Sequence, residues 1–106
     1  MRMWNVAPRL MCDQHLLGEH VEMHMFVGAM RKGVSMQGYI DGGLLEPAKL
    51  NSRHDELVQE MERRGMKHKS PLPEHPPLFE KGLVDSAGNL VELAKRCPAC
   101  RALQGE

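Results

Sequence analysis

Apolar side chains recur at helical spacing through the first third of the chain. With successive side chains about 100° apart around a helix axis, one face holds Leu10, Leu17, Val21 and Met25. A second apolar strip holds Leu16, Met23 and Val27. Pro8 suits a first helical turn, where its missing N–H needs no partner, and Gly33 can end the helix. The pattern predicts a helix from Pro8 to about Met30.

The rest of the chain predicts two more helices joined by irregular segments. Residues 31–45 are rich in glycine and indicate a loop, with a short extended piece around residues 34–40. Pro47 opens a second helix that ends at Gly65, a left-handed cap. The apolar stripe of this helix holds Leu50, His54, Leu57 and Met61.

The last third begins with a proline-rich segment, residues 70–83, which is expected to be irregular. Asp85 or Ser86 can then cap a third helix over about residues 87–96. Its inward side chains would be Leu90, Leu93 and Ala94. The prediction is an all-α fold: one small domain over residues 1–106 with about three helices, in which residues 84–106 form the third helix and a CPAC tail.

Composition narrows the class of protein. The 14 basic and 14 acidic residues cancel, which argues against a strongly basic nucleic-acid-binding domain but leaves a local basic patch possible. No apolar run approaches the roughly 20 residues of a membrane span, and no signal peptide is recognised. Three cysteines without an export signal indicate a reducing compartment. We therefore expect a cytoplasmic protein with no disulfide framework.

A polar sector lies between the two apolar strips of the first helix. It holds Cys12, His15, Glu19, Glu22 and Phe26. His15, Glu19 and Glu22 are candidates for acid–base chemistry in a half-buried groove, although a polar helix face explains them equally well. His20 and His24 fall with Asp13 on the remaining side and are expected to be exposed. The α-amine of Met1 is a further candidate nucleophile, because an α-amine is partly neutral at physiological pH.

The cysteines allow several interpretations. Cys97 and Cys100 form a CxxC, but a redox motif should accompany a βαβ pattern, which is absent here. A closed zinc site needs two more ligands, and Cys12 and His15, three residues apart on one helix face, can supply them. Such a site would join the C-terminus to the first helix. Alternatively, the three reduced cysteines pack as small apolar residues.

Other histidines and basic residues are weaker candidates. His20 and His24 have the spacing of two metal ligands, but the chain has no HExxH motif, so solvated side chains are the preferred interpretation. His54 is expected to be a core or groove residue. A basic run follows the second helix, comprising Arg63, Arg64, Lys67, His68 and Lys69. It is either a solvated helix end or, with Arg2, Arg31 and Lys32, a rim that contacts phosphates.

The segment DQHLLGEHVEMHMFVGAMRKG, residues 13–33, resembles the first helix of the pyrimidine-dimer DNA glycosylases, the phage endonuclease V type. The shared signature is Asp-Gln-His, a glutamate four residues after the histidine, another three further on, and Gly-Ala-x-Arg-Lys. RHDELVQEMERRGMKHK resembles a later helix of that family. The resemblance covers most of residues 1–69. Val21 and Met25 stand where the family has arginines, and the family's aromatic C-terminal segment has no counterpart.

The resemblance implies an all-helical DNA repair enzyme. In that family the N-terminal amine attacks C1′ of the damaged nucleotide, displaces the base through an imine and cuts the strand by β-elimination. Carried over without a gap, the nucleophile is the amine of Met1, the catalytic glutamate is Glu22, and His15 supports it. Glu19 would orient Glu22 or water. Phosphate contacts are expected from Arg2, Arg31, Lys32, Arg64 and Lys67.

The expected partner is double-stranded DNA with a damaged or modified base, by resemblance a pyrimidine dimer, bound by a monomer without a cofactor. A second hypothesis is a non-enzymatic module that binds nucleic acid or protein. In it zinc would be held by Cys12, His15, Cys97 and Cys100. The two hypotheses compete for His15, which cannot both ligate zinc and serve Glu22 freely.

Overall fold

Helices joined by irregular segments make up the computed structural model, which describes residues 1–67, 71–75 and 81–104. The α-helices are α1 (Asp13–Arg31), α2 (Gln37–Asp41), α3 (Leu50–Arg63), α4 (Ser86–Arg96) and α5 (Pro98–Gln104). Two short 3-10 helices, η1 (Pro8–Leu10) and η2 (Pro47–Lys49), precede α1 and α3. These ranges contain no strand. The predicted all-α class is confirmed, with two short helices, α2 and α5, beyond the three expected.

The first long helix begins later than the sequence predicts. Pro8 opens η1, the backbone is extended at Met11 and Cys12, and α1 starts at Asp13. The Cys12 sulfur caps α1 by accepting a hydrogen bond from the His15 N–H at 3.5 Å. This break turns the Pro8 and Met11 carbonyls toward Arg64 of α3, which donates to both. Arg64 thus supplies donors to two carbonyls at the point where the helical pattern is interrupted.

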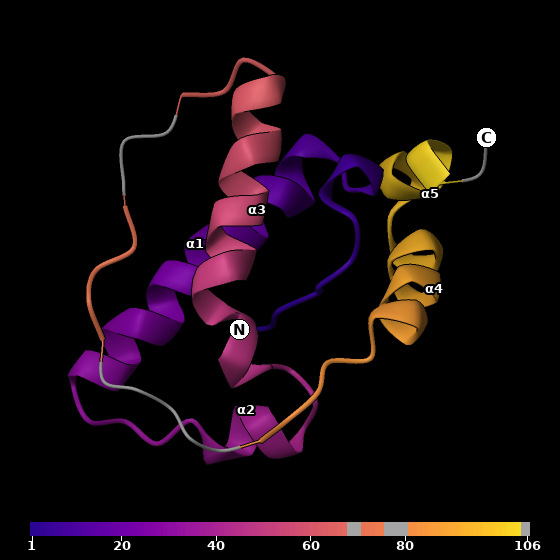
Figure 1. The fold of residues 1–106 in the computed structure, drawn as a ribbon. Helices are drawn as coiled ribbons and strands as arrows, with labels where there is room; N and C mark the ends of the chain where they lie inside the picture. The colour runs from indigo at the N-terminus through magenta and orange to yellow at the C-terminus, as the bar shows by residue number, and fades with distance from the viewer. Residues whose placement is uncertain (68–70, 76–80, 105–106) are drawn as a thin grey trace.

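Only one of the two apolar strips on α1 is buried. Leu16, Met23 and Val27 are fully buried, whereas the other strip is about half exposed at Leu17 (44%) and Met25 (50%). The buried face also includes the narrow sector between the two strips, which holds His20 and His24. The predicted exposure of His20 and His24 is therefore wrong: His20 is buried and His24 half-buried. Helix α3 crosses α1 (Figure 1). Its His54 ring contacts both imidazoles.

The glycine-rich segment after α1 folds as a helix rather than as the expected extended piece. Residues 37–41 form α2, in which the Gln37 side chain donates to the Asp41 carboxylate at 2.7 Å across one helical turn. Ile40 is buried on the inner side of α2. The Leu44 carbonyl then accepts from the Met3 N–H at 2.7 Å, which fixes the N-terminal segment. Glycine-rich composition alone therefore does not exclude a short helix.

Helices α3 and α4 follow the sequence pattern closely. The predicted stripe of α3 is buried, and Gly65 adopts the left-handed conformation (φ 80°) of a helix cap. Asp85 caps α4 by accepting from the Gly88 N–H at 3.0 Å. Leu93 is fully buried, and Leu90 packs against the core. Of the proline-rich segment, residues 71–75 and 81–83 are irregular as expected, and residues 70 and 76–80 lie outside the described residues.

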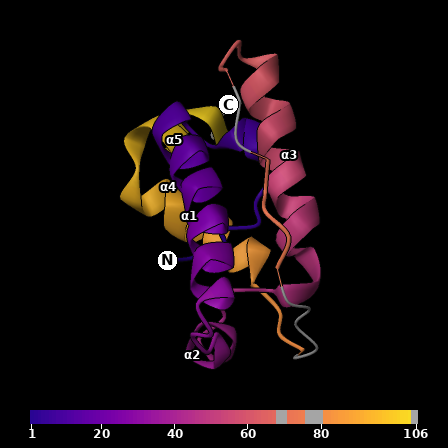
Figure 2. The same cartoon turned by 90° about the vertical axis from the view of Figure 1, so that its left-hand side faces the viewer.

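The elements pack around the N-terminal segment. Helix α3 lies against α1, and α4 and α5 pack together on the other side of residues 1–7, with α5 against η1 (Figures 1 and 2). The core is rich in methionine. The buried methionines are Met3, Met11, Met23, Met30, Met36 and Met61. Within the described part of the chain, no helix combines the length and apolar character needed to cross a membrane.

Candidate functional site

The N-terminal segment is held against α4 by polar contacts. The Arg2 guanidinium donates to the Asn89 side-chain oxygen at 2.8 Å and pairs with Glu92 at 3.0 Å. It also lies 3.8 Å above the Trp4 ring, at cation–π distance. Asn89 in turn donates to the Trp4 carbonyl at 2.9 Å. These contacts fix the position of the first residues of the chain.

A groove of about 410 Å³ opens between the N-terminal segment, α1 and α4. Its lining residues are Arg2, Trp4, Gln14, His15, Gly18, Glu19, Glu22 and Arg96. Three residues expected to act together, His15, Glu19 and Glu22, therefore share one groove with Arg2. The sequence interpretation missed Trp4 and Arg96. Their ring and guanidinium lie 5.5 Å apart, and no periodic pattern links residue 4 with residue 96.

Glu19 is committed to a buried ion pair. Arg53 of α3 donates to both its carboxylate oxygens, at 2.6 and 2.8 Å, and both side chains are at most 1% exposed. Burial opposes the charge on Arg53, but hydrogen bonds to Glu19 and then Glu56 outweigh it and raise the pKa of Arg53. Arg53 also donates to the Val6 carbonyl at 2.7 Å. The pair thus joins α1, α3 and the N-terminal segment.

Sequence reasoning missed Arg53, although a signal was present. Its position, three residues after Leu50 and four before Leu57, places it on the buried stripe of α3. A buried arginine requires a carboxylate partner. Glu19, in the middle of the buried face of α1, was the available candidate.

The four residues of the alternative zinc hypothesis come together at the start of α1. Cys12, His15, Cys97 and Cys100 place their ligand atoms within 4.8 Å of one another. The Cys12 sulfur lies 3.8 Å from the Cys97 sulfur and 3.3 Å from Nδ1 of His15, and that nitrogen lies 3.6 Å from the Cys100 sulfur. Tetrahedral zinc sets ligands roughly 3.6 to 3.8 Å apart. The cluster can therefore bind a metal such as zinc.

The surroundings of the sulfurs affect their ionisation. The Cys100 N–H donates to the Cys97 sulfur at 3.4 Å, and this hydrogen bond is the main cause that lowers the pKa of Cys97. Burial raises the pKa of the Cys100 thiol to about 12, although it accepts from the Cys12 N–H at 3.2 Å. A cation would offset the cost of a buried thiolate at Cys100.

The sequence profile of one family, described as pyrimidine dimer DNA glycosylase, matches residues 1–74. The chain belongs to this family. No curated protein and no solved structure matches it significantly. The family is one of DNA glycosylases, enzymes of DNA repair that act on DNA. In this pyrimidine dimer DNA glycosylase family member, the matched part includes all of the groove except Arg96, whereas α4, α5 and two of the clustered cysteines lie beyond it.

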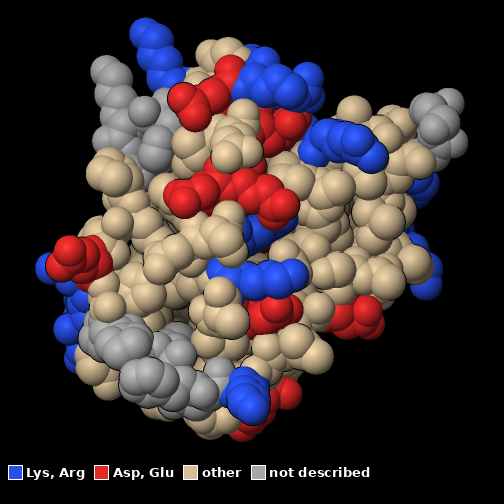
Figure 3. All heavy atoms as spheres, viewed as in Figure 1, with Lys and Arg blue, Asp and Glu red and all other residues tan. Residues whose placement is uncertain are grey.

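The five residues expected to contact DNA occupy different settings in the structure. Arg31 and Lys32 are exposed at the end of α1, and Lys67 is exposed beyond α3. Arg2 lines the groove but is engaged with α4. Arg64 pairs with Asp13 and Glu60 and donates to backbone carbonyls. On the face in Figure 3, acidic and basic side chains are interspersed among the described residues.

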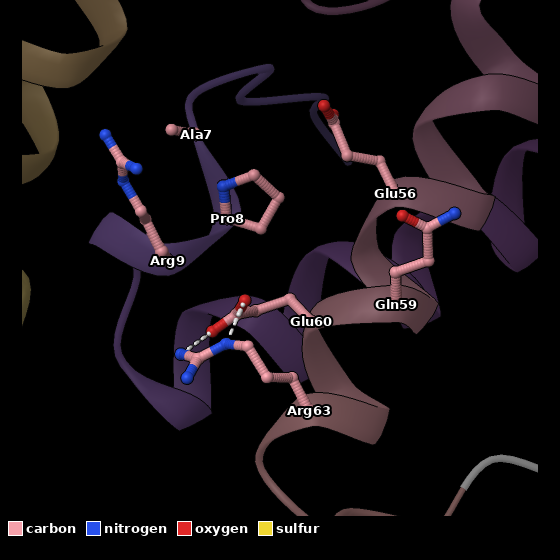
Figure 4. A pocket seen from close by; sticks show the side chains of 7 residues that line it. All are labelled: Ala7, Pro8, Arg9, Glu56, Gln59, Glu60 and Arg63. Carbon is pink, nitrogen blue, oxygen red and sulfur yellow. Dashed lines mark hydrogen bonds and ion pairs between the residues drawn. The ribbon is translucent and has the colours of Figure 1, made fainter.

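A second hollow, of about 520 Å³, lies between η1 and α3 and is shown in Figure 4. Its lining residues are Ala7, Pro8, Arg9, Glu56, Gln59, Glu60 and Arg63. Within it Glu60 is paired with Arg63 of the same helix. None of the expected catalytic residues lines this hollow, so the groove beside Trp4 is the better candidate for the active site.

Proposed function

We propose that the protein is a DNA glycosylase with AP-lyase activity whose nucleophile is the α-amine of Met1. Its substrate is double-stranded DNA that carries a damaged or modified base, by family a pyrimidine dimer. One observation carries the proposal. Glu22 lines a groove whose opposite wall is formed by Arg2 and Trp4, residues close to the N-terminal amine in sequence. This groove lies in the part of the chain that matches the family.

The proposed reaction proceeds through a covalent intermediate. The Met1 nitrogen forms a bond to C1′ while the bond from C1′ to the base breaks, and the base leaves with that electron pair. The nitrogen then loses a proton, and its lone pair forms a double bond to C1′ while the C1′–O4′ bond breaks. O4′ takes up a proton, so that the opened sugar is held as an imine. Removal of a proton from C2′ then expels the 3′ phosphate and cuts the strand. The enzyme must also bring the nucleotide out of the helix to reach C1′.

Glu22 is the proposed acid–base residue and stabilises the cationic sugar, because it is the half-buried carboxylate of the groove that Arg53 does not bind. Glu19 acts as a positioning residue: its bond to Arg53 fixes the helical turn that carries Glu22. His15 lines the same groove and also belongs to the cysteine cluster. Arg31, Lys32 and Lys67 contact phosphates outside the groove.

Borohydride trapping tests the proposal. Untagged protein, with its N-terminus verified by mass spectrometry, is incubated with duplex DNA that carries a thymine dimer or an abasic site and is then reduced. We expect a covalent adduct that maps to residue 1 with both substrates. Glu22→Gln should reduce the adduct on dimer DNA by roughly 100-fold or more, within the range for a lost acid–base group. Glu62→Gln, an exposed change on α3, is the matched control.

The same experiment has outcomes that contradict the proposal. An adduct at residue 1 with abasic DNA alone would disprove the pyrimidine-dimer substrate. No adduct with either DNA, from folded protein with a free N-terminal amine, would disprove the enzyme. It would favour the alternative, a non-enzymatic zinc-bound module that binds nucleic acid or protein.

We also propose that zinc binds Cys12, His15, Cys97 and Cys100 and serves a structural role. The sulfur–sulfur and sulfur–nitrogen distances support it, as do the backbone N–H donors to each of the three sulfurs. Four protein ligands leave no open position, as in structural zinc sites. Zinc bound there joins α5 to the start of α1. As a zinc ligand, His15 fixes the first turn of α1 and does not exchange protons with Glu22.

Metal analysis tests the zinc site. Cobalt bound by thiolates absorbs in the near ultraviolet through charge transfer from sulfur, and cobalt bound by imidazoles alone does not. We expect this band in the cobalt-loaded protein and a weaker band in Cys97→Ser, which keeps two of the three thiolates. Cys97 is half-buried, and serine has nearly the same volume. Ala99→Ser, an exposed change between the two cysteines, should keep the band. Absence of the band from the wild-type protein would contradict the site.

A further inference from the structure

A second group of possible metal ligands lies on the flank of α1 away from the groove. His20 and His24 of α1 and His54 of α3 place their ring nitrogens within 4.8 Å of one another. Their ring centroids are 4.8, 5.0 and 5.1 Å apart. His20 and His54 are buried, at 5% and 3% exposure. Three imidazoles from two helices thus meet at one point.

The fold explains why they meet. His20 and His24 are four residues apart, so both lie on the same flank of α1. His54 belongs to the buried stripe of α3, the helix that packs across α1. His15 of the cysteine cluster lies five residues before His20. The two side chains therefore point about 140° apart around the helix axis and lie roughly 7.5 Å apart along it. The imidazole group and the cysteine cluster therefore face different sides of α1 and share no ligand.

A neighbouring carboxylate orients one of the imidazoles. The Asp55 carboxylate lies 3.2 Å from Nδ1 of His54. Because a carboxylate only accepts, Nδ1 carries the proton and donates. In a neutral ring the lone pair is then on Nε2, the other side of the imidazole. A carboxylate that holds a histidine in this tautomer is a common partner of metal-ligating histidines.

We propose that His20, His24 and His54 bind a divalent transition-metal ion of the zinc class. Imidazole nitrogens suit zinc, nickel, copper and iron, whereas calcium and magnesium prefer oxygen. Tetrahedral zinc sets two nitrogens roughly 3.4 Å apart, so the ring nitrogens approach one another by rotation of the side chains. Three protein ligands leave a fourth position for water or a small anion.

The position of this ion defines its role. It joins α1 to α3 beside the Glu19–Arg53 pair and away from the groove. A hollow of about 370 Å³ that is lined by His54 and Asp55 gives it a route from solvent. Metal binding at this point stabilises the two helices that carry Glu22 and Arg53. The site is independent of the proposed glycosylase reaction and of zinc at the cysteines.

The test counts zinc ions bound by four full-length proteins after equilibration with zinc and removal of the excess. They are the wild type, His24→Gln, His54→Gln and His75→Gln. His75 contacts Asn51 and lies outside the cluster, so its variant is the matched control. We expect the wild type and His75→Gln to bind one zinc ion more per chain than the other two. This difference does not depend on what the cysteines hold.

Equal zinc content in all four folded proteins would overturn the proposal. Because a buried substitution can unfold the chain, the wild-type protein provides a second measurement. Zinc should shift the imidazole nitrogen resonances of His20, His24 and His54 in NMR spectra and leave those of His75 in place. Unshifted resonances of the three clustered histidines at saturating zinc would also overturn it.

Discussion

Arg53 is the residue on which the buried part of the candidate site depends most. It donates to both oxygens of Glu19, to Glu56 and to the Val6 carbonyl, all from one guanidinium that is almost fully buried. Its removal leaves a carboxylate and a carbonyl in the interior without that donor. The planar fork of five N–H donors explains why lysine cannot take its place.

At the same residue scale, we predict the cost of breaking this pair. Arg53→Met should lower the free energy of unfolding by about 3–5 kcal/mol, the usual cost of a buried charge that loses its partner. Arg53→Lys should recover less than half of it. The double variant Glu19→Met/Arg53→Met should be more stable than Arg53→Met, because no charge is then left buried. Urea unfolding followed by circular dichroism measures all three, and a loss below 1 kcal/mol in Arg53→Met would contradict the prediction.

At the scale of the elements, the sequence predicted those whose pattern is set locally. Helix α3 has a proline near its start, one apolar stripe and Gly65 after its end, and α4 has its Asp85 cap. These features depend on neighbours in sequence and persist in the fold. The start of α1 was wrong because it depends on Arg64, about fifty residues away, which donates to the carbonyls at the break.

The candidate site shows the same division between local and distant determinants. Glu19, Glu22 and His15 were placed on one sector of α1 by periodicity alone, and they line one groove. Which flank of α1 is buried depends on where α3 crosses it, so His20 and His24 were wrongly expected in solvent. Glycine-rich residues 31–45 carried too few apolar positions to distinguish α2 from an extended segment. The grouping of Cys97 and Cys100 with Cys12 and His15 was raised only as an alternative, because each pair has the local spacing of two zinc ligands but their contact joins distant parts of the chain.

At the scale of the whole molecule, Glu60 links the elements that meet at η1. Its carboxylate, near the end of α3, accepts from Arg63 and from Arg64, and Arg64 also reaches Asp13 and the Pro8 carbonyl. The hydrogen bond from Arg63, together with that from Arg64, lowers the pKa of Glu60 to about 2, although burial raises it. The folded protein therefore binds a proton at Glu60 less readily than the unfolded chain does.

This difference predicts how stability changes with pH. A depressed carboxyl pKa in the folded state stabilises the fold above the unfolded value of 4.5, and that contribution is lost as the pH falls from 4.5 toward 2. Glu60→Gln should remove it, so the variant's free energy of unfolding should fall less steeply over this range than that of the wild type. Glu62→Gln, exposed on the same helix, should retain the wild-type slope. Chemical unfolding at a series of pH values measures the slopes, and equal slopes in Glu60→Gln and Glu62→Gln would show that the Glu60 pairs do not contribute to acid stability.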